Sequence, residues 1–282
     1  MTPILLALVA SGVVTQADAE RIDRQLDPNA ARLWAEEILT QSFERGLTAQ
    51  QRRILTVLNE AQGQPTPQAL ARLWAQEDEL LWRDVRDDVV SVAIDRGIAA
   101  SISAADPNTW MLVNEEVVNA VDIWYLSDAA ESFGSIPNLN TTSRQQFAEA
   151  FQAWQLGDRT PGNYAQGLPQ LINELMPTFG RQRARVVGVT ETTRLFSIAE
   201  QASAMANPEI TYLQWLTAED ELVCPICGPR ANRIVGKESD GFRAATDSTV
   251  GFPPAHPNCR CSIASLTAAA YGALSNRGMV RA

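Results

Sequence analysis

The sequence predicts a mainly α-helical protein, with a multi-helix N-terminal and central region and a small, loop-rich α+β unit at the C-terminal end. Two observations support this fold class. Up to about residue 206, apolar residues recur at helical spacing and are punctuated by Pro and Gly. From Pro208 onward, short alternating runs of strand formers are separated by polar, Gly-rich stretches. Three segments are therefore expected: a helical N-terminal region (1–120), a second helical region (121–206) and a small strand-and-loop unit (207–282).

The first residues, MTPILLALVASGVVTQADA, resemble a secretory signal, but no basic residue precedes the apolar run. We favour a short helical hairpin instead. Thr15 would cap its second helix, and Asp18, three residues later, would complete a capping box. The exposed apolar face is then the expected docking element of this region. That face is formed by Leu5, Leu6, Leu8 and Val9, and the turn by Ser11 and Gly12.

Further helices follow in order, each bounded by the residues that start and stop helices. The first is ARLWAEEILTQSFERG, which is expected to stop at Gly46, and the second is LTAQQRRILTVLNEAQG, with Thr48 as its cap and Gly63 as its stop. The third begins with PTPQALARLW and is expected to end at Gly97. After NEEVVNAVDIWYLSDAAESFG, a loop (SIPNLNTT) is expected to lead into the helix SRQQFAEAFQAWQLG. TPGNYAQGLPQLINELMPTFG carries a helical core, and RQRARVVGVTETTRLFSIAEQASAMAN is the last long helix.

Three short strands are expected in the C-terminal unit, in ITYLQWLT, RIVG and CSIASLT. Such a small unit buries little apolar area and would benefit from a staple. A candidate staple is present, because all four cysteines and the single histidine of the chain lie between Cys224 and Cys261. Cys224 and Cys227 form a C-x-x-C pair, and 28 residues separate it from His256, Cys259 and Cys261.

Two pairs of ligands separated by a loop are the usual layout of a structural tetrahedral zinc site, and we expect one zinc ion per chain. Five candidates compete for four positions. If CRCSI is extended, Cys259 and Cys261 lie on one face, which favours a four-cysteine site with His256 beside it. Alternatively, His256 and Cys259 supply the second pair. A redox pair, two disulfides or a catalytic metal are less favoured, because no thioredoxin-like pattern, oxidising context or general base accompanies the cysteines.

The charge distribution limits the function classes. The formal net charge of −10 argues against generic nucleic-acid binding through a basic surface. Residues 1–150 hold 22 acidic and 11 basic residues, whereas residues 151–282 hold 11 and 12, so any contact with a polyanion is expected in the second half. Arg181, Arg183 and Arg185 form a locally basic stretch there. Three interpretations of these arginines are open: they contact DNA phosphates, they form a solvated helix face, or they pair with acidic residues of the N-terminal half.

WLTAEDELVCPICGPRANRIVG followed by GFPPAHPNCRCSI resembles the phage Mu F-like head morphogenesis family, the minor head proteins of tailed bacteriophages. The resemblance covers roughly residues 125–266, and the first 120 residues show no such pattern. It makes segment 121–206 the helical part of a head-morphogenesis domain. The motif positions include Trp215 and Asp220 next to the cysteines, and Thr190 and Glu191 in the last helix. Relatives often carry Arg before Thr-Glu, where this chain has GVTETT, so we expect Glu191 to pair with another residue, such as Arg194.

The resemblance implies a non-enzymatic minor head protein that acts in capsid assembly at or near the portal. Its expected partners are the portal protein, the major capsid protein or both, with weak contact to packaged DNA, no small-molecule substrate and no membrane. Its expected location is the head interior or portal vertex of the virion, after assembly in the host cytoplasm; a domesticated prophage relative is equally compatible. The alternative is a metal-dependent nuclease with a Cys-braced finger, for which a single histidine is too few. Thr190 and Glu191 are interpreted as a buried pair that joins the helix to the zinc unit, in preference to an active site.

Overall fold

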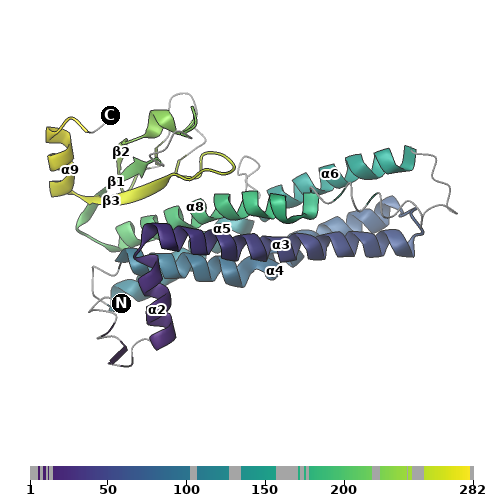
Figure 1. Cartoon of the computed structure of the whole chain (residues 1–282), viewed down its shortest axis with the longest axis horizontal. Coiled ribbons are helices and arrows are strands. Elements are labelled where there is room, and N and C mark those ends of the chain that lie inside the picture. The colour runs from purple at the N-terminus through teal and green to yellow at the C-terminus, as the bar shows by residue number, and fades with distance from the viewer. Residues whose placement is uncertain are drawn as a thin grey trace. The chain divides into compact units, whose positions relative to one another are not determined.

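The structure is a computed structural model that describes residues 6, 9–10, 12, 15–101, 107–126, 135–156, 171, 175, 178–217, 223–239, 241–242 and 251–279 (Figure 1). Its long helices, small antiparallel sheet and C-terminal Cys/His cluster confirm the fold class expected from the sequence. None of the described helices is long and apolar enough to cross a membrane. The helices are α2 (Gln16–Gln25), α3 (Pro28–Glu60), α4 (Pro67–Ser101), α5 (Pro107–Leu126), α6 (Ile136–Leu156), α8 (Arg181–Ala206) and α9 (Ala268–Asn276).

Two compact units share these elements, and each combines segments that are distant in the sequence. Unit 1 comprises Met1–Glu36, Val89–Ile123 and Val189–Ala282, and unit 2 comprises Glu37–Asp88 and Trp124–Gly188. The boundaries 1–120, 121–206 and 207–282 divide the chain consecutively and stay a prediction. The candidate metal residues fall in unit 1, together with the first residues of α3 and most of α8.

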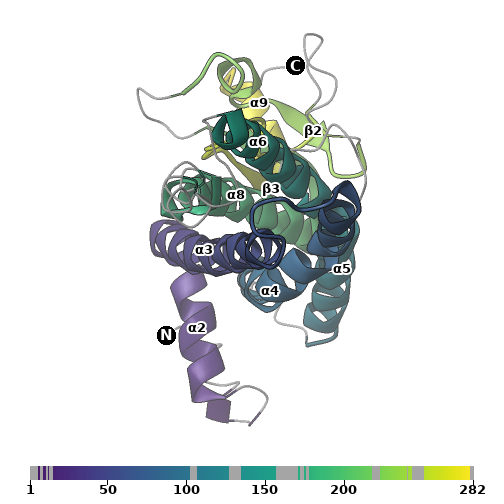
Figure 2. The ribbon, with the colours of Figure 1, turned by 90° about the vertical axis from the view of Figure 1, so that its right-hand side faces the viewer.

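Helix α2 starts as the sequence predicts. The backbone N–H of Asp18 donates to Thr15 Oγ1 at 3.1 Å, and the Thr15 hydroxyl donates to the Asp18 carboxylate at 2.6 Å. Ala19 and Ile22 of α2 are buried, and Val9 packs against them. Leu6 is half exposed. Leu5, Leu8 and Ser11 of the expected hairpin lie outside the described residues. Figure 2 shows α2 extending away from the start of α3.

Helix α3 corrects one expectation, because it runs without interruption through Gly46 and Thr48. A Cβ on Gly46 would lie 2.8 Å from Cδ1 of Leu81 and 3.2 Å from Cγ1 of Val85. The glycine therefore serves the close packing of α3 on α4, not a helix end. The expected stop at Gly63 is confirmed, since Gly63 has φ +77° and its N–H donates to the Leu58 carbonyl at 2.8 Å.

Two further helix boundaries differ from expectation, each for its own reason. Gly97 lies inside α4, where an added Cβ would be 3.0 Å from Cγ1 of Val113 in α5. The expected loop SIPNLNTT is largely the first part of α6. Ser135 accepts from the Asn138 N–H at 3.4 Å, and Pro137 is tolerated in the first turn of a helix. The segment TPGNYAQGLPQLINELMPTFG lies mostly outside the described residues, and α8 confirms the last long helix.

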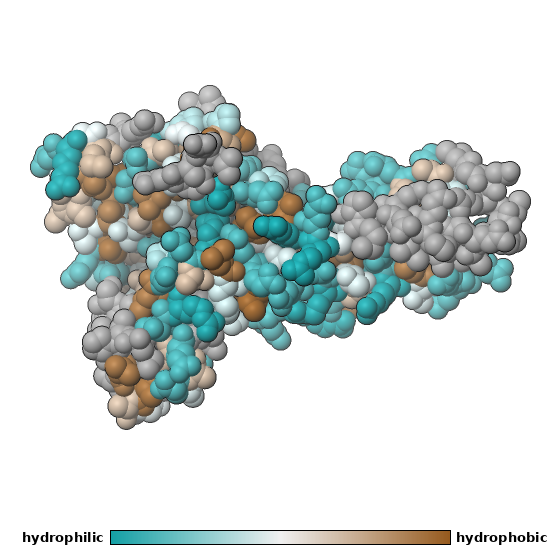
Figure 3. Space-filling view, in the orientation of Figure 1, coloured by the Kyte–Doolittle hydropathy of each residue, from teal (hydrophilic) through white to brown (hydrophobic). Residues whose placement is uncertain are grey.

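The sheet contains the three expected strands: β1 (Ile210–Leu216), β2 (Ile234–Gly236) and β3 (Ser262–Thr267). Its order is β2-β1-β3, both pairings are antiparallel, and β1 follows α8 directly (Figure 1). Helix α9, which the sequence did not predict, starts at Thr267, whose hydroxyl accepts from the Ala270 N–H at 3.2 Å. On the face drawn in Figure 3, hydrophilic residues predominate and brown patches are small.

A small core lies under the sheet. Trp215 and Phe242 are fully buried and meet edge to face, with ring centroids 5.5 Å apart. Leu213, Ile263 and Ala255 belong to the same cluster, and so do three cysteines. The hydrophobic core of this end of the chain thus contains the candidate metal ligands: Cys227, Cys259 and Cys261, with Cys224 packed against them.

Candidate metal centre

The C-x-x-C pair forms a tight turn that presents both sulfurs to one side. The N–H groups of Cys227 and Gly228 donate to the Cys224 carbonyl at 3.1 and 2.9 Å. The N–H of Cys227 also lies 3.4 Å from the Cys224 sulfur. The turn continues into the short 3₁₀ helix η3 (Gly228–Arg230). This geometry is typical of a zinc knuckle, in which backbone N–H groups support the thiolate.

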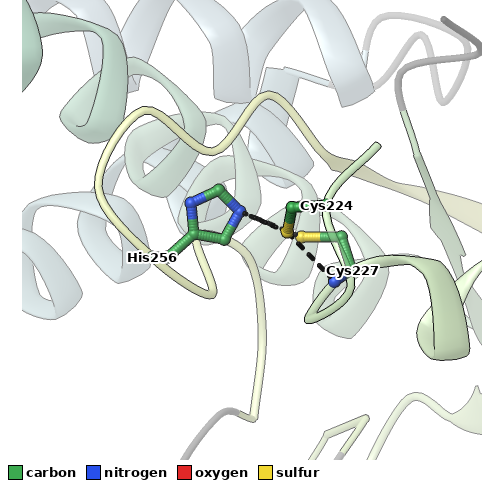
Figure 4. Close-up of side chains that lie close together, drawn as sticks. All are labelled: Cys224, Cys227 and His256. Carbon is green, nitrogen blue, oxygen red and sulfur yellow. Dashed lines mark hydrogen bonds between the residues drawn. The ribbon is translucent and has the colours of Figure 1, made fainter. Parts of the chain in front are cut away.

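His256 approaches this turn from the loop that precedes β3. Its Nε2 lies 3.0 Å from the sulfur of Cys224 and 3.3 Å from that of Cys227. Figure 4 shows the imidazole pointing at the Cys224 sulfur, with the Cys227 sulfur beside it. The other ring nitrogen, Nδ1, is 2.8 Å from the Pro257 carbonyl, and a carbonyl can only accept. Nδ1 therefore carries the proton, and Nε2 presents a lone pair to the sulfurs, as in a metal-ligating histidine.

A second group of sulfurs adjoins the first and shares Cys227. The sulfurs of Cys227, Cys259 and Cys261 lie within 4.8 Å of one another, and Cys227 and Cys259 are 3.8 Å apart. In a tetrahedral site with Zn–S bonds of about 2.3 Å, two sulfurs are separated by about 3.8 Å. The structure thus brings all five candidates predicted from the sequence into two groups of three that share Cys227, and each group is compact enough to hold a metal ion.

The thiols of this cluster perturb one another. The pKa of Cys259 is lowered to about 2, because Cys227 and then Cys261 hydrogen-bond to its sulfur. The pKa of Cys227 is raised far above its usual value by its hydrogen bonds with Cys259 and Cys261 and by burial. A bound cation would lower the cost of removing the proton from Cys227.

One aromatic and one cationic side chain, Trp215 and Arg230, lie in the same part of the fold as the cluster. The indole of Trp215 lies by Cys261. The pKa of Cys261 is raised to about 12, because its hydrogen bond with Cys227, which lowers the pKa, is outweighed by its hydrogen bond with Cys259 and by burial. The buried guanidinium of Arg230 lies 5.8 Å from the centroid of the Trp215 ring, and its Nη1 donates to the Ile226 carbonyl. A positive charge is thus held against the Trp215 ring, which packs in the same core as the cysteines. Arg230 was not among the residues predicted from the sequence, although its position three residues after the C-x-x-C pair was a usable signal.

Helix α8 holds the loop that carries His256 and Cys259. The backbone N–H of Asn258 donates to Thr190 Oγ1 at 2.9 Å, and the hydroxyl of Thr193 donates to the Cys259 carbonyl at 2.6 Å. Thr190 therefore does join the helix to the cysteine-rich unit. Thr193 was missed, although it lies one turn further along the same face.

Glu191 has a different partner. Its carboxylate accepts from Arg194 Nε at 2.9 Å, and both side chains are buried, with relative exposures of 0 and 8%. The expected pairing of Glu191 with Arg194 is confirmed. The two side chains of this ion pair lie one turn apart on α8.

The basic stretch at the start of α8 does not form one exposed patch. Arg181 is exposed but lies 3.5 Å from both Glu37 and Glu44. Arg183 is largely buried and donates to Ser143 and to the carbonyls of Thr178 and Leu139. Burial lowers its pKa to about 10. Arg185 is exposed.

Of the two motif positions next to the cysteines, Trp215 and Asp220, the structure describes only Trp215. Trp215 is a core residue of the sheet, as described above. Asp220 lies outside the described residues, and so does most of the acidic turn around it. The firmest part of the site is therefore the Cys/His cluster and the two threonines of α8 that hold its loop.

Comparison with known families gives one match, to the family described as "Phage Mu protein F like protein", over residues 160–264. The matched segment includes α8, β1, β2 and all five candidate ligands. No curated protein and no solved structure matches the chain. The resemblance seen in the sequence is thereby confirmed: residues 160–264 of this chain match the phage Mu F-like proteins, and the match suggests a phage head morphogenesis protein.

Proposed function

We propose that this chain is a non-enzymatic minor head protein that acts in head assembly at or near the portal vertex. The observation that supports this proposal most directly is the Cys/His cluster. The residues that carry the family resemblance in the sequence, Cys224 to Cys261, meet at one place in the fold and lie within the family match. Portal and major capsid proteins are the proposed partners, and the head is the proposed location.

The cluster is proposed to hold one structural zinc ion. Its four ligands would be Cys224, Cys227, His256 and Cys259, because His256 has the tautomer of a ligand and Cys259 lies at the tetrahedral spacing from Cys227. Cys261 would then lie beside the metal and hydrogen-bond to a ligating sulfur. When bound, zinc supplies a cross-link between the C-x-x-C turn and the loop before β3. It would stabilise a core that is otherwise small for its loop content.

The absence of catalysis is part of the proposal and has its own support. The chain has one histidine, and both of its ring nitrogens are engaged, Nδ1 by the Pro257 carbonyl and Nε2 by the cysteine sulfurs. A metal-dependent nuclease of the finger type needs a histidine free to accept a proton from water. His256 offers no nitrogen for that task.

Contact with packaged DNA would have to rely on few of the arginines at the start of α8. Of the three arginines at the start of α8, Arg181 lies against two glutamates and Arg183 is committed to the interior of unit 2. Any contact through this stretch would rest mainly on Arg185 and would be sensitive to salt.

The direct test is mass spectrometry of purified mature heads from the source phage, with the copy number referred to the portal protein. A fixed, low copy number supports a minor head component. If the chain is found in neither mature heads nor assembly intermediates, the head-protein proposal is wrong. Magnesium-dependent plasmid nicking that is lost in His256→Ala would instead establish the nuclease alternative.

A further inference from the structure

We propose that Arg32, in the first part of α3, is a positioning residue of the metal centre and couples metal binding to the docking of this end of α3. Arg32 lies 128 residues before the family match begins at residue 160. This inference rests on the proposed zinc site, but it concerns a part of the chain that neither the motif nor the match includes.

The guanidinium of Arg32 binds the backbone of the metal loop directly. Nη1 donates to the Arg260 carbonyl at 3.1 Å, and Nη2 lies 3.4 Å from the Cys259 carbonyl. Nη2 also donates to Thr193 Oγ1 at 2.7 Å, and Nε donates to Glu36 Oε1 at 2.9 Å. All three guanidinium nitrogens therefore have hydrogen-bond partners: Nη1 and Nη2 bind the loop and α8, and Nε binds a residue of α3 itself. The side chain is only 20% exposed.

Three consecutive residues of the loop are thereby held by their backbone groups. Asn258 donates its N–H to Thr190, the Cys259 carbonyl accepts from Thr193 and Arg32, and the Arg260 carbonyl accepts from Arg32. Asn258 has φ +61°, a left-handed conformation in which asparagine is better tolerated than most residues. The loop is fixed by helices on one side, and its His256 and Cys259 side chains face the cluster on the other.

This arrangement has the features of an outer-shell contact in a metal site. Such contacts orient the ligands, and their loss typically weakens metal binding about 10- to 100-fold. Lysine cannot replace the arginine fully, because the planar fork of guanidinium N–H groups reaches two carbonyls and a hydroxyl at once. By linkage, if Arg32 favours metal binding, the metal must favour the docked state of α3 to the same extent.

The experiment measures zinc release and local protection in the full chain. Wild type, Arg32→Met, Arg32→Lys and the control Arg45→Met are loaded with zinc, and release to an excess of a chromogenic chelator is followed. Arg45 lies on the same helix, is 61% exposed and contacts only Asp88 among the ion pairs of the described residues. We expect about 10- to 100-fold faster release from Arg32→Met, an intermediate rate from Arg32→Lys and an unchanged rate from Arg45→Met.

Hydrogen–deuterium exchange of wild type with and without zinc tests the reciprocal effect and does not depend on a variant that folds. We expect removal of zinc to speed exchange in residues 28–36 and to leave residues 48–60 of the same helix unchanged. The proposed coupling would be overturned, with the metal centre left intact, by equal zinc release rates in wild type and Arg32→Met. Exchange rates in residues 28–36 that are the same with and without zinc would have the same consequence. A wild-type chain that binds no zinc would overturn the coupling and the proposed metal centre together.

Discussion

Replacing Cys227 by serine should weaken zinc binding far more than replacing Cys261. Cys227 belongs to both groups of candidate ligands, and its sulfur lies 3.3 Å from His256 Nε2 and 3.8 Å from the Cys259 sulfur. Cys261 belongs to one group and lies by the Trp215 indole. The two cysteines are similarly buried, so the substitutions are matched in chemistry and in environment.

The magnitude follows from the number of ligands. Structural zinc sites bind with about 10–16 kcal/mol, which over four ligands gives about 2.5–4 kcal/mol each. At 1.4 kcal/mol per factor of ten, Cys227→Ser should lose about 60- to 700-fold in affinity. Cys261→Ser removes a neighbour of the ligands and keeps a hydrogen-bonding group, so a loss of about tenfold is expected.

The assay is competition with a chelator of known affinity, followed by substitution with Co²⁺. In the cobalt form, the sulfur-to-metal charge-transfer band should decrease in Cys227→Ser, because one of three thiolates is lost, and should be retained in Cys261→Ser. His256→Ala should resemble Cys227→Ser in affinity. If Cys261→Ser loses as much affinity as Cys227→Ser while His256→Ala loses little, the four-cysteine site is correct and our assignment of His256 is refuted.

Three further predictions concern the packing of α8 and the chemistry of the cluster. Gly188→Ala should destabilise the protein by about 1–3 kcal/mol, because the new Cβ would lie 2.6–3.0 Å from atoms of Thr40. Gly272→Ala is the control: no atom lies within 4 Å of the new Cβ, so this variant should be neutral or stabilising by up to about 1 kcal/mol. Calorimetry of both variants checks this, and equal melting temperatures would contradict it. Glu191→Gln should cost about 3 kcal/mol or more in urea unfolding, since it leaves a buried arginine without its carboxylate; an unchanged midpoint would show that the ion pair is unimportant. Zinc affinity should rise with pH by about tenfold per unit for each proton displaced, because the raised pKa of Cys227 keeps this thiol protonated at neutral pH without metal, and titrations at pH 6, 7 and 8 that give one affinity would rule this out.

Local signals in the sequence were sufficient for the elements whose ends depend on neighbouring residues. The Thr15 cap and the Gly63 stop act within one helical turn, and the strand at 210–216 has the composition and alternation of a strand. The predicted helix ends at Gly46 and Gly97 were wrong. In the local sequence, Gly46 and Gly97 look like glycines that end a helix. In the structure each lies inside a helix and allows another helix to pack closely, and this packing cannot be recognised from the sequence.

The sequence by itself determined the chemistry of the candidate site. The residue types and spacing of Cys224, Cys227, His256, Cys259 and Cys261 predict a metal site and carry the family resemblance, because ligand chemistry depends on side-chain identity. The tertiary structure decided which groups face one another: the ring nitrogen that His256 presents to the sulfurs, the partners that occupy Arg181 and Arg183, and the long-range contact of Arg32 with the metal loop. These depend on contacts between segments separated by up to 228 residues, and such contacts are set by packing rather than by local pattern.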